Sequence, residues 1–240
     1  MGTTEGVNFF PLMIAGFVFM GIGALVSYQL KSRFTKYSKI ASQRGLSGKE
    51  IAEQMLRYYG IYDVKVISVQ GQLTDHYNPL NKTVNLSESV YNERNAAAAA
   101  VAAHECGHAV QHATAYQWLT LRSKLVPLQN VSGKILQTIM LVLMFGGYAL
   151  FTAFPVDLVL WVMVAAYGIT ALFSLVTLPV EFDASKRALV WIKDSGTATH
   201  GEYEMSKDAL KWAAMTYVVA ALSAITSLII VLMQLLGRRD

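Results

Sequence analysis

The chain has 240 residues, of which 54% are hydrophobic and 15% are charged, with a net charge of +4 and a single cysteine. This composition excludes a disordered chain and a disulfide-rich scaffold, because Cys106 has no second cysteine to pair with. Asp157 is the only charged side chain within residues 9–30, 135–179 and 212–236. These stretches exclude a simple soluble globule and indicate a membrane protein that carries a soluble domain.

The apolar stretches are long enough to cross a bilayer, for which a helix needs about 20 residues. Residues 9–30 and 212–236 each provide one span. Residues 135–179 provide two spans, because Pro155 and Asp157 favour an interfacial turn in the middle of that stretch and so predict a helical hairpin. The sequence therefore predicts about four transmembrane helices.

Basic residues flank the soluble segment at both of its ends, next to the predicted spans. Lysine and arginine close to a span favour the cytoplasmic side, so residues 31–134 are expected in the cytoplasm. Arg238 and Arg239 would then lie outside, but two terminal residues weigh less than the flanking clusters. The basic excess therefore indicates topology and contact with anionic lipid, not binding to nucleic acid. The flanking residues are Lys31, Arg33, Lys36, Lys39 and Arg44, followed later by Arg122, Lys124 and Lys134.

The first part of the soluble segment reads as a helix followed by a strand. Ser47 and Glu50 have the spacing of a capping box and predict a helix over residues 48–59, which Gly60 can end. Residues 62–69 alternate in polarity and are rich in β-branched side chains, so they predict a strand.

A second strand and a long helix follow after a loop. Residues 83–86 predict a short strand, and Ser87 is expected to cap a short helix over residues 88–91. Asn95 is expected to cap a helix over residues 96–114, which begins with a run of alanines. Such small side chains let a helix approach its neighbours closely, so we expect this helix to be buried.

The long helix contains the sequence HECGH at residues 104–108, which predicts a zinc site. His104 and His108 are four residues apart, roughly 6 Å along one helix face, and can bind one tetrahedral Zn²⁺. Glu105 lies about 100° round the helix, where it can reach a water on the metal without being a ligand. Zinc lowers the pKa of such a water to about 7, and the carboxylate can take its proton and pass it to the leaving amine. Cys106 is expected to pack as a small apolar residue.

A catalytic zinc site needs a third protein ligand, and the long helix does not provide one. His112 lies about 12 Å along the helix from His104, too far for both to join one ion together with His108. The convincing carboxylates that remain are Glu181 and Asp183, directly after the third span. Two spans separate them from the histidines, so the chain returns to the same side of the bilayer. The residues leave both carboxylates possible and favour Glu181.

Three segments together resemble the YugP-like family of bacterial neutral zinc metallopeptidases. They are residues 73–79 (LTDHYNP), 104–108 and 178–185 (LPVEFDAS), and the resemblance extends over nearly the whole chain. The family is similar to the gluzincin membrane proteases of the HtpX and CAAX-prenyl types, whose third ligand is the glutamate of an E-x-x-A-D motif. That motif matches the chain from Glu181 to Ala184, so the resemblance implies Glu181 as the third ligand.

The last position of this motif departs from the family pattern. Ser185 replaces an aspartate that would orient a ligand histidine, so Asp183 or a backbone carbonyl is expected to share that role. The resemblance also implies that residues 83–86 form an edge strand along which a peptide pairs, with His76 and Tyr77 near the substrate cleft. His76 would stabilise the oxyanion there or close over the substrate, or else be an ordinary solvated loop histidine, which is the commoner case.

The predicted fold is a mainly α membrane protein with a cytoplasmic α+β zincin-like catalytic domain that contains a small β-sheet. Its expected parts are an N-terminal anchor (1–30), the metallopeptidase domain (31–134), a transmembrane hairpin (135–179), a cytoplasmic helix that supplies the third ligand (180–211) and a C-terminal span (212–240).

The predicted function is that of a membrane-integral zinc endopeptidase with one Zn²⁺ per chain. Its active site would lie at the cytoplasmic face of the bacterial cell membrane and act on membrane or membrane-proximal proteins. Its expected partners are a peptide or protein substrate and the lipid bilayer, without nucleic acid, and the sequence does not indicate an oligomeric state. One alternative is an inactive zinc-binding scaffold or quality-control adaptor. A transporter is disfavoured, because the spans contain no ionisable side chain besides Asp157 and tyrosines.

Overall fold

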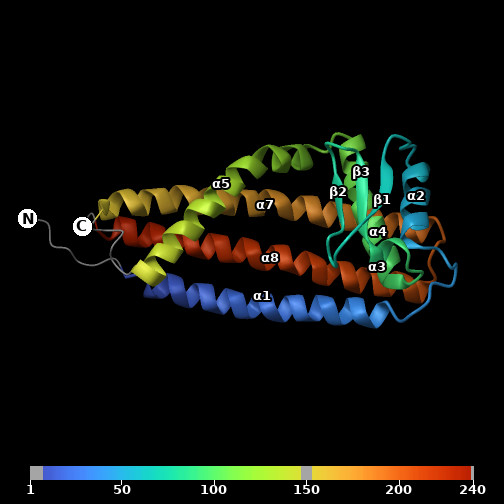
Figure 1. The fold of residues 1–240 in the computed structure, drawn as a ribbon, viewed down its shortest axis with the longest axis horizontal. Coiled ribbons are helices and arrows are strands. Elements are labelled where there is room, and N and C mark those ends of the chain that lie inside the picture. The colour runs from blue at the N-terminus through green and yellow to red at the C-terminus, as the bar shows by residue number, and fades with distance from the viewer. Residues whose placement is uncertain (1–7, 147–152, 239–240) are drawn as a thin grey trace, which may run out of the picture. The chain divides into compact units, whose positions relative to one another are not determined.

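The computed structural model describes residues 8–146 and 153–238 and is mainly helical (Figure 1). Four of its helices, α1, α5, α7 and α8, are long and apolar enough to cross a membrane. Together with a small three-stranded sheet, this confirms the predicted mainly α membrane protein with a small α+β domain. In chain order the elements are α1 (Phe10–Tyr37), α2 (Gly48–Tyr58), β1 (Lys65–Val69), β2 (His76–Asn78), β3 (Thr83–Ser87), α3 (Glu88–Tyr91), α4 (Ala96–Ala113), α5 (Gln117–Gly146), α7 (Val156–Asp194) and α8 (His200–Leu236).

The chain divides into two compact units, each assembled from separate stretches of sequence. The apolar unit comprises Met1–Ala24, Leu121–Val176 and Tyr217–Asp240. The sheet-containing unit comprises Leu25–Thr120 and Thr177–Thr216. Helices α1, α7 and α8 each contribute residues to both units.

The apolar unit has a small core and a largely apolar exterior. Leu12 of α1 packs with Leu160 and Met163 of α7 and with Val231 and Leu235 of α8. In all four candidate spans most residues of the apolar window are not buried within the protein. A bilayer covers such apolar exteriors, and helices satisfy their own backbone groups within it, as a multi-pass membrane protein requires.

The sheet-containing unit holds a three-stranded sheet in the order β1-β3-β2. Strand β3 pairs in parallel with β1 and antiparallel with β2, where Tyr77 lies opposite Val84. The expectation that residues 83–86 form an edge strand is therefore wrong. The sequence before them was expected to be only a loop, but His76–Asn78 forms the third strand, and the Asn78 side chain closes the turn by accepting from the backbone N–H groups of Leu80 and Asn81.

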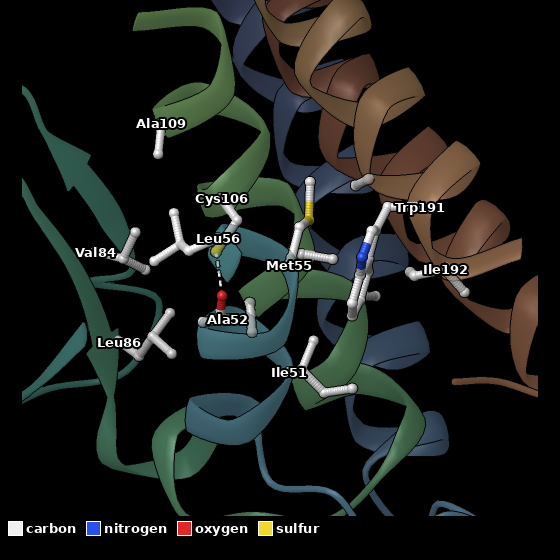
Figure 2. Close-up of a cluster of buried hydrophobic side chains, with 14 of the residues drawn as sticks. Ile51, Ala52, Met55, Leu56, Val84, Leu86, Cys106, Ala109, Trp191 and Ile192 are labelled. Carbon is white, nitrogen blue, oxygen red and sulfur yellow. Dashed lines mark hydrogen bonds between the residues drawn. The ribbon is translucent and has the colours of Figure 1, made fainter. Parts of the chain in front are cut away.

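The core of this unit lies between the sheet and helices α2, α4 and α7 (Figure 2). Met55 of α2, Val84 of β3 and Trp191 of α7 are almost completely buried there. Cys106 of α4 is buried in the same cluster, and its thiol donates to the carbonyl of Ala52 over 3.5 Å. The cysteine thus packs as a small apolar side chain, as expected.

Two of the three predicted helix caps are present. Ser47 and Glu50 form the reciprocal capping box at the start of α2, and the Asn95 side chain accepts from the third backbone N–H of α4. Ser87 precedes α3 but does not cap it. Its hydroxyl donates instead to the carboxylate of Asp75. This hydrogen bond links the segment before β2 to the end of β3, and it takes the place of the cap.

Helix α7 continues through Pro179, where the expected transmembrane hairpin (135–179) ends and a separate cytoplasmic helix (180–211) was expected to begin. Proline removes one backbone N–H, and the helix tolerates this loss where packing on both sides holds it. Val180 and Ala184 are completely buried directly after the proline. The second half of α7 therefore extends into the sheet-containing unit as one helix.

Helices α4 and α7 approach each other closely at Gly107. A Cβ atom added there would overlap the carbonyl oxygen of Ala184 and lie only 3.1 Å from its Cα. The opposing atoms are backbone and cannot move aside as a flexible side chain would. Gly107 therefore sets the distance between the two helices.

We expect Gly107→Ala to destabilise the sheet-containing unit by about 1–3 kcal/mol, because the added methyl group forces α4 and α7 apart. Thermal unfolding of the full-length protein in detergent measures this effect. Gly201→Ala is the matched control, since a Cβ at that helical position meets nothing within 4 Å. Equal melting temperatures for the two variants would contradict the proposed contact.

Candidate metal site

Helix α4 places His104 and His108 side by side within the sheet-containing unit. They lie one turn apart on one face, with ring centroids 4.9 Å apart and ring planes at 83°. The alanines at the start of α4 allow this helix to be buried between α2, β3 and α3. The histidines are consequently held on a mostly buried helix.

Glu181 of α7 lies against both imidazoles. Its Oε2 atom is 3.4 Å from Nε2 of His104 and 3.6 Å from Nε2 of His108. The candidate ligand atoms of the three residues all lie within 4.8 Å of one another. The side chain of Glu181 is only 3% exposed, so its carboxylate is directed into the protein. Asp183, the other carboxylate that the sequence left possible, is not part of this group.

The outer ring nitrogens of both histidines have partners of their own. Nδ1 of His104 lies 3.1 Å from the Ser185 hydroxyl, and Nδ1 of His108 lies 3.0 Å from Oε1 of Gln111. Both Nε2 atoms are therefore directed toward Glu181. Two imidazole nitrogens and one carboxylate oxygen form the ligand set of many catalytic zinc sites, so the residues present fit a zinc ion.

The electrostatics of the three residues favour a positive charge between them. Burial lowers the pKa of His108, but the hydrogen bond and the negative charge of Glu181 outweigh it, and the pKa lies above its usual value. A metal cation can supply this positive charge in place of the proton, provided that the imidazole is deprotonated.

Glu105 follows His104 on α4 and contacts strand β2. Its Oε2 atom accepts a hydrogen bond from the backbone N–H of Tyr77 over 3.0 Å. The Tyr77 hydroxyl lies 2.7 Å from Nδ1 of His112, and burial raises the pKa of Tyr77 to about 12. Tyr77 thus joins β2 to α4 through both its backbone and its side chain, and His112 contacts this tyrosine.

The remaining predicted residues have different surroundings. His76 is exposed, and its Nδ1 atom lies 2.8 Å from the carbonyl of Thr74 in its own loop. Asp183 accepts from Nε of Arg187 over 2.6 Å and from Nε2 of Gln111 over 2.9 Å. Gln111 was not among the predicted site residues. Gln111 lies three residues after His108 on the same helix face. This spacing could have indicated that its side chain contacts the histidine.

Comparisons with known proteins agree with the chemistry of this site. The sequence profile of the family described as "Putative neutral zinc metallopeptidase" matches residues 12–236. The chain is also 39% identical over 229 residues to the "Putative membrane protease YugP" of Bacillus subtilis (strain 168), covering 93% of this chain and 98% of that protein. No solved structure matches the chain.

Both matches extend over almost the whole chain, including the candidate spans as well as the helices that carry the histidines and Glu181. The resemblance recognised in the sequence is thereby confirmed. The chain belongs to the family described as "Putative neutral zinc metallopeptidase".

Proposed function

We propose that the protein is a membrane-integral zinc endopeptidase that hydrolyses peptide bonds of membrane or membrane-proximal proteins. One observation carries the proposal: two imidazoles and a carboxylate converge within 4.8 Å, and a further carboxylate, Glu105, follows the first histidine on the same helix. Membership of a zinc metallopeptidase family supports the reaction class. The four apolar helices support its location in a membrane.

We assign the metal to His104, His108 and Glu181, which would leave one coordination position for water or substrate. Zinc bound there supplies Lewis acidity, which polarises the scissile carbonyl and makes water acidic enough to lose a proton near neutral pH. Ser185 and Gln111 keep the imidazoles in the orientation that this binding requires.

Glu105 is the proposed general base and acid. Its carboxylate accepts a proton from the attacking water as the new C–O bond forms, and it donates that proton to the amine nitrogen as the C–N bond breaks. The Tyr77 N–H holds Oε2, so we assign the proton transfers to Oε1. The burial of Glu105, which is 8% exposed, limits competition from bulk water for this oxygen.

The substrate backbone would approach from the side of β2. This strand has β3 on one side, and its other side carries the Tyr77 N–H that contacts Glu105. Extended peptides bind proteins by adding to such an edge. A peptide that pairs along this side of β2 would therefore pass beside Glu105, which places the scissile bond next to the proposed base.

We expect Glu105→Gln to retain zinc but to lose peptide cleavage by a factor on the order of 10²–10⁴, because glutamine has the same shape and cannot take a proton. Metal analysis and a cleavage assay on the same purified protein measure both effects. Comparative proteomics of membranes from wild-type and Glu105→Gln cells would identify the substrates. If wild-type protein with bound zinc cleaves no substrate in any of these assays, the inactive scaffold is the better description.

We expect purified protein to contain about one zinc ion per chain, and Glu181→Ala to lower this content at least as far as Asp183→Ala does. The reason is that Glu181 contributes a ligand atom, whereas Asp183 reaches the site through Gln111. Metal analysis after dialysis measures the zinc content of each variant. Loss of zinc in Asp183→Ala alone would show that the third ligand has been assigned wrongly.

We place the active site at the cytoplasmic face of the membrane. A reporter fused within residues 31–95 is expected to be cytoplasmic, because basic residues flank this segment at both ends. Alkaline phosphatase and green fluorescent protein fusions at one position give opposite signals and control for each other. If the phosphatase fusion is active and the fluorescent protein fusion at the same position is dark, the segment lies outside the cytoplasm and the proposed topology is wrong.

A further inference from the structure

Gln111 is a buried polar side chain next to the candidate ligands, and both its amide oxygen and its amide nitrogen have partners. It is 0% exposed and lies on α4, one turn after His108. Its Oε1 atom lies 3.0 Å from Nδ1 of His108. Its Nε2 atom donates to the carbonyl of Val180 over 2.8 Å and to Oδ2 of Asp183 over 2.9 Å. A single amide thus joins one candidate ligand on α4 to two groups on α7.

The partners of Gln111 determine which way its amide faces. A backbone carbonyl and a carboxylate only accept hydrogen bonds, so both need the NH₂ group of the amide. The opposite orientation would place the amide oxygen against two acceptors inside the protein, which is costly in a buried environment. The Oε1 atom must therefore face His108.

The orientation of the amide in turn determines which ring nitrogen of His108 carries a proton. Because Oε1 of Gln111 is an acceptor, Nδ1 of His108 must carry a proton to bond with it. A neutral imidazole has only one N–H, so its lone pair is then on Nε2, the nitrogen that lies 3.6 Å from Glu181. His104 differs in this respect, since its partner, the Ser185 hydroxyl, can either donate or accept.

We propose that Gln111 and Asp183 are positioning residues that act in series to hold His108 with Nδ1 protonated and Nε2 ready for the metal. Asp183 acts on His108 only through Gln111, by fixing the orientation of its amide. Arg187 keeps Asp183 in place, because its Nε donates to the same Oδ2 atom over 2.6 Å. This inference rests on the proposed function, in which His108 is a zinc ligand.

The test is the zinc affinity of the full-length protein in detergent, measured by competition with a chromophoric chelator. Gln111→Met keeps the length of the side chain and removes its hydrogen bonds, so we expect zinc to bind about 10- to 100-fold more weakly. Asp183→Leu should weaken binding by a similar factor. Asp183→Asn should stay close to wild type, because both donors use one oxygen atom, which asparagine can also provide.

The double variant Gln111→Met, Asp183→Leu distinguishes action in series from separate effects. In series, the second substitution changes the zinc affinity of Gln111→Met by about twofold at most. If the double variant instead loses zinc affinity by the product of the two single-variant factors, Asp183 acts independently of Gln111, as a ligand would. That result would overturn the proposal. Ser206→Ala is the matched control for the loss of a buried hydrogen bond, since Ser206 is 1% exposed and donates to the Glu202 carbonyl. We expect it to bind zinc as the wild type does.

Imidazole ¹⁵N spectra of the zinc-loaded wild-type protein provide a second readout. This measurement does not depend on whether any variant folds. They should show Nε2 of His108 on the metal and Nδ1 protonated, and the reverse assignment would overturn the proposal. The outcomes also separate this inference from the proposed function. If Glu181→Ala loses zinc while Gln111→Met binds it normally, only the inference fails. If the wild type binds no zinc, the proposed function fails and the inference fails with it.

Discussion

The close contact of α4 with α7 at Gly107 is the constraint on which the candidate site depends. Glu181 precedes Ala184 by almost one turn of α7, and Gly107 directly precedes His108 on α4. The backbones must touch at this point for a side chain as short as glutamate to reach both imidazoles. The glycine in the HECGH sequence is therefore as important for the geometry of the site as the ligands themselves. The alanine run before it contributes in the same way, because it lets α4 pack closely in the core.

A contact this close buries polar groups that need partners. Gln111, Ser185 and Glu181 are all less than 10% exposed, and burying them without hydrogen bonds or charge partners would cost several kcal/mol. The structure meets this requirement by pairing across the two helices, from Gln111 to Val180 and Asp183 and from Ser185 to His104. The polar network and the helix contact therefore depend on each other. Each holds α4 and α7 in the register that the other needs.

Features that depend on local spacing could be predicted from the sequence, and features that depend on tertiary packing could not. The capping box at Ser47 and the pair of histidines follow from helix geometry alone. Strand β2 has only three residues, too few for an alternating pattern, so a loop was predicted there. The edge strand that the resemblance implied at residues 83–86 is instead the central strand, because β2 pairs with it. Pro179 suggested a boundary, because a proline in isolation favours one, but buried neighbours keep α7 continuous. Gln111 escaped notice, because a glutamine has no motif until its partners on another helix are known.

The order of the segments along the chain links membrane insertion to assembly of the site. The sheet-containing unit is interrupted after Thr120 and resumes at Thr177, and the intervening residues belong to the apolar unit. The first portion contains the histidines and Glu105, whereas the second contains Glu181, Asp183 and Ser185. If the intervening stretch inserts as two spans, an even number of crossings returns the second portion to the side of the first. A chain that failed to insert this hairpin correctly would keep its histidines without the third carboxylate. On the proposed assignment, such a chain would lack a complete zinc site, so activity would arise only after correct insertion.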